Sequence, residues 1–345
     1  MIDSLNTLPY IIGDVLSADI RPLQSFLLSN PSRPLVATGS GGSETAADLA
    51  ALLYGARGGV ATAVSPYTLN SFSDSALSAS KVLLISKGGH NKDIVFAAKR
   101  ALEVNPAGTA ALFLSHGDRN RAEKEFRKKG SPNGFVIPVG GIKEGFVSTG
   151  TAFAYFALLV RVFQEGVDLR KYLSAPKTPY TLCLNDGTPL SVEDLNGVRH
   201  YIILQGGWGR PVAWNLEGKM VECGLAGAGV YDYRNYCHGR FIYTSNHLED
   251  SAVVLLISPR EKDIAERIRG FLPARTRLVI IESGEVAPET ALDLLIRATS
   301  FYGDVCEACG VNHSRPSTPG RIDKRIPINI PFMATLKASG PLSID

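Results

Sequence analysis

Three ionisable residues in the second half of the sequence have the types and spacing of an acid–base set. Lys219 and Glu222 lie one turn apart on one face of a predicted helix, and His238 follows after a further short interval. A carboxylate can move a proton between neighbouring carbons while a second acid–base group serves an oxygen, and a lysine beside the carboxylate keeps it ionised. The alternative interpretation is an exposed ion pair and a histidine in a turn.

A glycine-bearing segment in the first half, residues 39–43, separates a predicted strand from a predicted helix. Its Gly42 and Ser43 could serve an anion, because glycines allow close approach of the backbone and the free amides at a helix start donate hydrogen bonds. The alternative is a tight turn that needs glycine for packing alone. The segment matches neither the dinucleotide-binding pattern nor the nucleotide-triphosphate loop.

A second polar segment, residues 86–93, follows another predicted strand and contains Ser86, Lys87 and Asn91. Ligands of doubly wound sheets bind at the carboxyl ends of the strands, where both segments are predicted to lie. Alternatively, Asn91 or Asp93 caps the next helix and the lysines are solvated.

These segments are positioned by an alternation of short apolar runs and longer amphipathic stretches, which predicts parallel strands joined by helices. Helical periodicity covers residues 45–54 and 93–104. The strands predicted in the first half are residues 35–38, 60–64, 81–86, 110–115 and 134–139.

The layout starts again after a stretch rich in proline and threonine near residues 174–189, which is typical of a linker. Residues 201–204 form the next predicted strand, followed by a glycine-rich loop and a helix to about Cys223. An apolar strand that ends in serine before Lys-Asp-Ile occurs once in each half and suggests an internal duplication. We expect one domain over residues 1–190 and a second over residues 191–345.

Composition narrows the function classes. The 345 residues carry 36 basic and 33 acidic side chains, so nothing in the charge motivates binding to nucleic acid. No apolar run is long enough for a membrane span and no signal peptide is indicated, which predicts a cytoplasmic protein. Cys306, Cys309 and His313 could hold a metal, but their spacing on a predicted helix fits ordinary burial better, and we expect no metal site.

Taken together, residues 40–43, 86–89 and 144–149 resemble, in order and spacing, the signatures of the first domain of double sugar-isomerase (SIS) proteins. The resemblance covers about residues 35–325. The family members most similar in pattern are the isomerase half of glucosamine-6-phosphate synthase and the stand-alone deaminases and deglycases of amino-sugar phosphates. The resemblance implies an α/β fold of two tandem domains, each a doubly wound, flavodoxin-like parallel sheet.

The resemblance also implies roles for individual residues. Glu222 would be the base that moves the proton between the first two sugar carbons, His238 would open the sugar ring, and Lys219 falls on the family's lysine. Asn215 stands where the family usually has an acidic residue. The residues implied in substrate binding are Gly42, Ser43, Ser86, Lys87, Asn91, Ser148 and Arg321.

Departures from the family pattern change what is expected. Lys87 replaces a glutamine of the phosphate loop and could compensate with a full positive charge. Arg321 falls where the synthase has a catalytic lysine, and an arginine does not readily form a Schiff base, so glucosamine synthesis itself is not expected.

We therefore expect a sugar-phosphate isomerase, or an amino-sugar-phosphate deaminase or deglycase, that needs no cofactor. The alternative is a non-catalytic sensor of a phosphosugar or nucleotide-like ligand that signals to a partner protein. SIS sites are commonly completed by a neighbouring subunit, so a homodimer or larger assembly is expected, with His238 crossing over.

Overall fold

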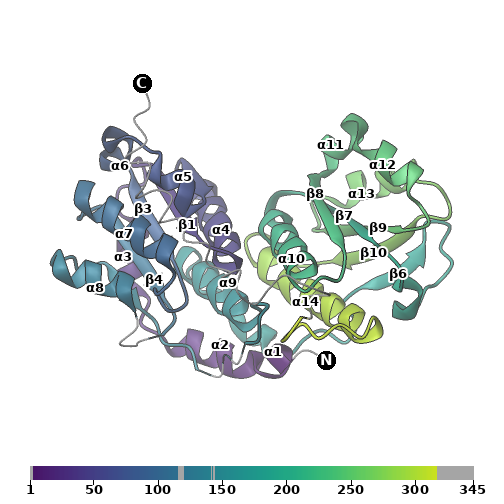
Figure 1. Cartoon of the computed structure of the whole chain (residues 1–345), viewed down its shortest axis with the longest axis horizontal. Helices are drawn as coiled ribbons and strands as arrows, with labels where there is room; N and C mark the ends of the chain where they lie inside the picture. Colours follow the sequence, from purple (N-terminus) through teal and green to yellow (C-terminus); the bar gives the residue numbers. More distant parts are fainter. Residues whose placement is uncertain (1–2, 116–119, 141, 143, 317–345) are drawn as a thin grey trace, which may run out of the picture.

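The computed structural model describes residues 3–115, 120–140, 142 and 144–316, which form two α/β domains, one after the other along the chain (Figure 1). The first domain is built on a parallel sheet with the strand order β2-β1-β3-β4-β5, which is the flavodoxin-like order. Its strands are β1 (Leu35–Gly39), β2 (Ala61–Val64), β3 (Lys81–Ile85), β4 (Thr109–Phe113) and β5 (Gly134–Val136).

Every residue of β1, β3 and β4 is buried, as expected for parallel strands that have helices on both faces. One face packs against α4, α9 and the N-terminal helices α2 and α3, and the other packs against α5 to α8. The helices are α1 (Asp3–Asn6), α2 (Leu8–Ser17), α3 (Arg21–Leu28), α4 (Gly42–Ala56), α5 (Pro66–Asn70), α6 (Asp74–Ala79), α7 (Lys92–Val104), α8 (Arg121–Lys128) and α9 (Gly150–Phe163).

The second domain repeats this plan. Its sheet has the order β6-β10-β9-β7-β8, so the four strands β7 to β10 reproduce the arrangement of β1 to β4. The repeated motif of a strand before Lys-Asp-Ile falls on β3 and β9, which hold corresponding positions in the two sheets. The strands are β6 (Thr181–Leu184), β7 (His200–Gln205), β8 (Gly227–Asp232), β9 (Ser251–Ile257) and β10 (Arg277–Glu282).

One strand of the second sheet departs from the parallel pattern. β6 pairs with β10 in the antiparallel direction, whereas the fifth strand of the first sheet, β5, is parallel to β4. β6 belongs to the second sheet although it precedes residue 190, where the boundary between the domains was expected.

The helices of the second domain also cover both faces of their sheet. α10 and α14 lie on the face that meets the first domain, while α11 and α13 pack against the other. The helices are α10 (Arg210–Glu222), α11 (Tyr233–Asn235), α12 (Phe241–Asn246), α13 (Lys262–Arg269) and α14 (Glu289–Ala308); the short helical turns are η1 (Leu169–Tyr172), η2 (Val192–Leu195), η3 (Gly207–Gly209) and η4 (Tyr236–Arg240). No helix in the described ranges has the length and apolarity needed to cross a membrane.

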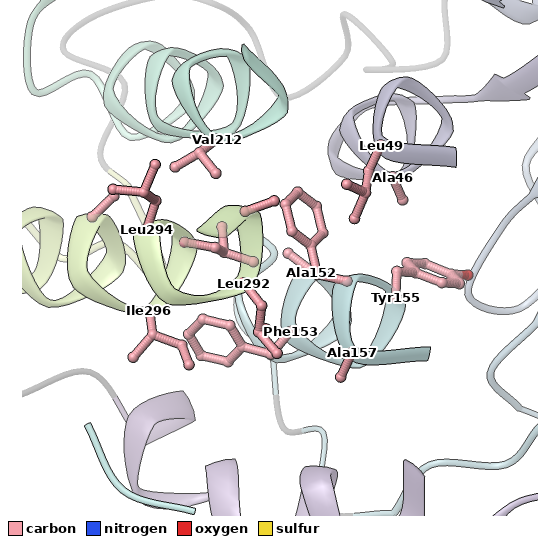
Figure 2. Close-up of a cluster of buried hydrophobic side chains, with 14 of the residues drawn as sticks. Ala46, Leu49, Ala152, Phe153, Tyr155, Ala157, Val212, Leu292, Leu294 and Ile296 are labelled. Carbon is pink, nitrogen blue, oxygen red and sulfur yellow. The ribbon is translucent and has the colours of Figure 1, made fainter. Parts of the chain in front are cut away.

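Four helices form a shared layer between the two sheets. α4 and α9 come from the first domain and α10 and α14 from the second, and their apolar side chains meet in one buried cluster (Figure 2). Leu49, Phe153, Val212 and Leu292 in this layer are fully buried. Burying one such side chain stabilises the fold by about 1.5 to 3 kcal/mol, so this layer fixes the position of one domain against the other.

Candidate active site

A pocket of about 480 Å³ lies between the domains, where the start of α4 faces one side of α10 along the length of that helix. Since α4 begins directly after β1, the pocket is beside the carboxyl end of that strand, where doubly wound sheets bind ligands. The first domain contributes Gly41, Gly42, Glu44, Thr45, Asp48, Ala63, Val147 and Ser148, and α10 contributes Arg210, Trp214, Asn215, Glu217, Gly218, Lys219 and Glu222.

The structure places Lys219 and Glu222 together in this pocket, on one face of α10. Lys219 is only 3% exposed, and its Nζ donates a hydrogen bond to Oδ1 of Asn215. Asn215 in turn donates from Nδ2 to Oγ1 of Thr45 at 3.2 Å, and Thr45 donates to the carbonyl oxygen of Gly42 at 2.8 Å. A chain of hydrogen bonds therefore joins the lysine on α10 to the first turn of α4 in the other domain.

Burial is the main cause of the pKa shifts of Lys219 and Glu222. It lowers the pKa of Lys219 to about 7, although the charges of Glu144 and Glu222 oppose the shift. Burial also raises the pKa of Glu222, and Lys219 offsets only part of that increase. The charge of Lys219 favours the ionised carboxylate, but the pKa of Glu222 still lies above its ordinary value.

Glu144 connects several residues of the first domain through hydrogen bonds and an ion pair. Its carboxylate accepts hydrogen bonds from Oγ of Ser148 at 3.1 Å and from the backbone and hydroxyl of Thr151, both at 2.6 Å. It also pairs with Nζ of Lys87 at 3.0 Å. Burial would raise the pKa of Glu144, but the hydrogen bonds from Thr151 and the charge of Lys87 outweigh it and lower the pKa. A phosphate at Lys87 would have to share this ammonium with Glu144.

The other residues of the expected phosphate site also have structural partners. Asn91 caps α7 by accepting from the backbone amide of Asp93 at 2.8 Å, and its Nδ2 lies 3.5 Å from Oγ of Ser40. Ser86 is buried and accepts from the amide of Gly89 at 3.2 Å. Of these bonds, the one between Asn91 and Ser40 joins the two glycine-bearing loops, and the other two lie within the second loop.

The backbone requires glycine at three positions of these loops, residues 39, 41 and 89, and Gly41 has a φ of +57°. A Cβ on Gly39 would come within 2.2 Å of the carbonyl oxygen of Ser43, and Gly89 has a φ of +59° with Asn120 against it. Gly42, in contrast, lines the pocket, and a Cβ there would only touch Ser148 at 3.4 Å. Ser43 is the second residue of α4 and half-buried, beside the pocket rather than in its wall.

His238 is not brought to the pocket within one chain. β8 begins soon after Glu222 and ends soon before His238, so the two residues lie at opposite ends of a strand that spans about 17 Å. His238 is exposed, in η4 between α11 and α12. Arg321 lies outside the described residues.

The pocket residues that were not predicted as site residues include five with charged or aromatic side chains: Glu44, Asp48, Arg210, Trp214 and Glu217. Arg210 of the second domain pairs with Asp48 of the first at 3.2 Å, a contact that crosses the interface. Glu44 and Asp48 are four residues apart and share one helix face directly after the glycine loop. That spacing could have predicted them as site residues from the sequence. Among residues 3–115, 120–140, 142 and 144–316, no three His, Cys, Asp or Glu side chains cluster as metal ligands would.

Comparisons with known proteins address the fold. No protein-family model matches the sequence, and no curated protein does. The structure is similar to the tagatose-6-phosphate ketose/aldose isomerase of Escherichia coli, with a TM-score of 0.69 and 18% identity over 92% of this chain and 94% of that one.

Two further solved structures are similar along nearly their whole length. One is the glucosamine-6-phosphate deaminase of Thermotoga maritima, with a TM-score of 0.61 and 14% identity over 90% of this chain and 97% of that one. The other is the C-terminal domain of glucosamine-fructose-6-phosphate aminotransferase from Francisella tularensis, with a TM-score of 0.60 and 11% identity over 90% and 96%. The predicted α/β fold of two doubly wound domains in tandem is thereby confirmed.

Proposed function

We propose that this chain binds a phosphorylated sugar in the pocket between its domains and transfers a proton between the first two sugar carbons. The observation that carries the proposal is that Lys219 and Glu222, from the second domain, share one pocket with the glycine-bearing start of α4 in the first. An acid–base pair and an anion-binding helix start are the two parts that such a reaction needs.

In the proposed reaction Glu222 acts as the base. It removes the proton from the second carbon of an open-chain aldose and returns it to the first carbon. The hydroxyl proton on the second carbon's oxygen moves to the aldehyde oxygen in the enediol stage, so the aldehyde becomes a hydroxyl and the second carbon becomes the ketone. Lys219, when protonated, offsets the negative charge that develops on the enediol oxygens. In an amino-sugar phosphate the same proton transfer would precede release of the amine.

The phosphate would be bound at the two glycine-bearing loops, by Ser43, Ser86 and Lys87, with Gly42, Asn91 and Ser148 beside them. The direct bond between Asn91 and Ser40 supports this, because it places the loops next to each other. The solved structures with the same fold include, by their names, a phosphosugar isomerase and a phosphosugar deaminase, which supports both forms of the reaction.

The test is proton exchange in heavy water. The protein is incubated with a panel of hexose phosphates and amino-hexose phosphates, and proton NMR follows the signal at the second carbon. Loss of that signal for at least one compound, with or without net conversion, is the expected result. If no compound exchanges a proton, the catalytic function is wrong.

A non-catalytic sensor is the second candidate. Two observations favour it: His238 lies away from the pocket of its own chain, and the ammonium of Lys87 is already paired with Glu144. Binding of a phosphosugar without any proton exchange would support the sensor.

We also propose a homodimer or larger assembly in which His238 reaches the pocket of a neighbouring chain. This would supply the ring-opening group that a single chain does not place beside Glu222. A cytoplasmic location stays a prediction.

A further inference from the structure

Two cysteines on neighbouring helices of the second domain have no role in the proposed chemistry. Cys223 caps the C-terminal end of α10, and Cys306 lies in the last turn of α14. Both are free thiols in the buried layer between the sheets, with exposures of 4% and 1%. Their side chains contact each other as hydrogen-bond partners. Close approach of the two side chains is the first condition for a disulfide.

The sulfur of Cys223 is surrounded by donors that stabilise a thiolate. It accepts hydrogen bonds from the thiol of Cys306, the hydroxyl of Tyr302 and the backbone amide of Leu225. The hydroxyl of Tyr302 is fully buried, has no oxygen or nitrogen partner among the described residues, and lies against the two sulfurs. When protonated, Cys223 donates to the carbonyl oxygen of Met220 at 3.5 Å, a weak bond whose loss costs little.

These hydrogen bonds make the two cysteines differ in acidity. The bond from Cys306 is the largest cause that lowers the pKa of Cys223, and together with the other donors it outweighs the effect of burial. The same bond and burial raise the pKa of Cys306. Cys223 therefore loses its proton first, while Cys306 keeps its own. A thiolate beside a protonated thiol is the arrangement found in redox-sensing cysteine pairs.

Cys223 is also the better placed of the two to meet a small oxidant. It lies at the edge of the buried layer, between the exposed residues Glu222 and Gly224. Cys309, one turn beyond Cys306 on α14, is half-buried and packs against the same layer, but burial raises the pKa of its thiol. An oxidant that selects for thiolates therefore acts on Cys223 first.

We propose that Cys223 and Cys306 form a site of reversible oxidation, at which hydrogen peroxide converts the two thiols into a disulfide between α10 and α14. The sulfur of Cys223 attacks one peroxide oxygen, and the O–O bond breaks. Hydroxide leaves and takes up the proton that Cys223 released, and Cys223 becomes a sulfenic acid. The sulfur of Cys306 then attacks that sulfur, the S–O bond breaks, and the hydroxyl leaves as water with the proton of Cys306.

In total the two thiols lose two electrons and the peroxide becomes two water molecules. The cross-link fixes the end of α10 that carries Lys219 and Glu222, so the oxidation site borders the pocket. It depends on the two helices alone, and it stands whether or not the proposed sugar chemistry is correct.

Peptide mapping of the folded, full-length protein detects the cross-link. The protein is treated with a severalfold molar excess of hydrogen peroxide near neutral pH. Free thiols are then blocked with N-ethylmaleimide in urea, and the chain is cut after glutamate. Glu307 lies between Cys306 and Cys309, so these two cysteines fall in different peptides. We expect mass spectrometry to find the peptides of Cys223 and Cys306 joined, and dithiothreitol to separate them.

Three variants assign the steps to individual side chains. Cys306→Ser should abolish the cross-link and leave Cys223 as a sulfenic acid, which dimedone traps. Tyr302→Phe should slow cross-linking about three- to tenfold, because a hydrogen bond to the thiolate is lost while the remaining thiolate is more nucleophilic. Cys237→Ser removes an exposed thiol outside the pair and is the matched control, with an unchanged rate.

The wild-type protein alone decides the proposal. It is overturned if Cys223 and Cys306 both stay open to N-ethylmaleimide after Cys237 has been oxidised, or if the cross-link joins Cys223 to Cys309 instead. Cross-linking at the same rate in Tyr302→Phe, with thermal melting showing that this variant is folded, would remove the hydroxyl from the site.

Discussion

Lys219 shows how burial changes the chemistry of a single side chain. Its ammonium loses hydration in the interface between the domains, and one amide oxygen, that of Asn215, replaces only part of it. The pKa therefore falls from the ordinary 10.5 to about 7. Near neutral pH this lysine changes its charge beside Glu222, so the pocket is sensitive to pH in that range.

This shift predicts how stability depends on pH. Between pH 7 and 10.5 the unfolded chain keeps the Lys219 proton while the folded chain releases it, so the folded state gains stability as pH rises. Below pH 7 both states hold the proton and the cost of burying it is fully present. Lys219→Met should abolish this dependence, which for one proton has a slope of at most about 1.4 kcal/mol per pH unit.

Urea unfolding of both proteins at several pH values between 6 and 10 measures the difference. As the pH rises, the free energy of unfolding of the wild type should increase relative to that of the methionine variant. If the difference in unfolding free energy between the two proteins stays constant across this pH range, Lys219 is charged in the folded protein.

Glu222 is the residue on which proton transfer depends. Glu222→Gln keeps the size of the side chain but removes the base, so turnover should fall about a hundredfold or more while ligand affinity stays within a fewfold. Exchange in heavy water and calorimetry on the same protein preparation measure the two quantities. A fully active glutamine variant would exclude Glu222 as the base.

Spacing along the sequence predicted the part of the site that lies on one element. Lys219 and Glu222 are one turn apart, so a helix necessarily presents them on one face. The partner of Asn215 could not be predicted in this way, because Thr45 is 170 residues away in the other domain. The same is true of Arg210 and Asp48, whose contact depends on how the domains pack.

At the scale of elements, the buried parallel strands were the most predictable feature. β1, β3 and β4 are mainly apolar and begin within one residue of the predicted positions, because burial on both faces leaves no polar alternation. β6 was not predicted. It is four residues long, its first residue is exposed, and it follows a proline-rich stretch, so local sequence offers little to distinguish it from a linker.

The helix layer between the sheets predicts that the domains unfold together. Phe153 on α9 is fully buried against the second domain's helices (Figure 2), so Phe153→Ala should destabilise the protein by about 3 to 5 kcal/mol. Phe271→Ala, at a side chain that is 89% exposed, is the control and should cost less than about 0.5 kcal/mol. Calorimetry should show one transition at a lower temperature for Phe153→Ala. Two separate transitions in wild type would contradict a shared layer.

In the whole molecule, Glu222 and His238 are far apart, so activity is expected to depend on assembly of the chain into an oligomer. If His238 serves the pocket of a neighbouring chain, Glu222→Gln and His238→Ala damage different halves of a shared site. Mixing the two inactive variants should then restore up to about a quarter of the activity, from mixed dimers that hold one intact site.

Each variant alone, refolded in the same way, is the control for that experiment. Sedimentation of the wild type at micromolar concentration should show a dimer or a larger species. A monomer, or a mixture no more active than its components, would mean that His238 acts within its own chain or has no role.

The antiparallel edge strand determines where the polypeptide can be divided into independently expressed fragments. A C-terminal fragment that begins at residue 191 lacks β6, so the outer edge of β10 is left with unpaired backbone groups, which promote aggregation. A fragment that begins at residue 174 retains β6 and differs by only seventeen residues. Co-expressed with residues 1–173, the longer fragment should reconstitute a complex in solution, and the shorter one should precipitate.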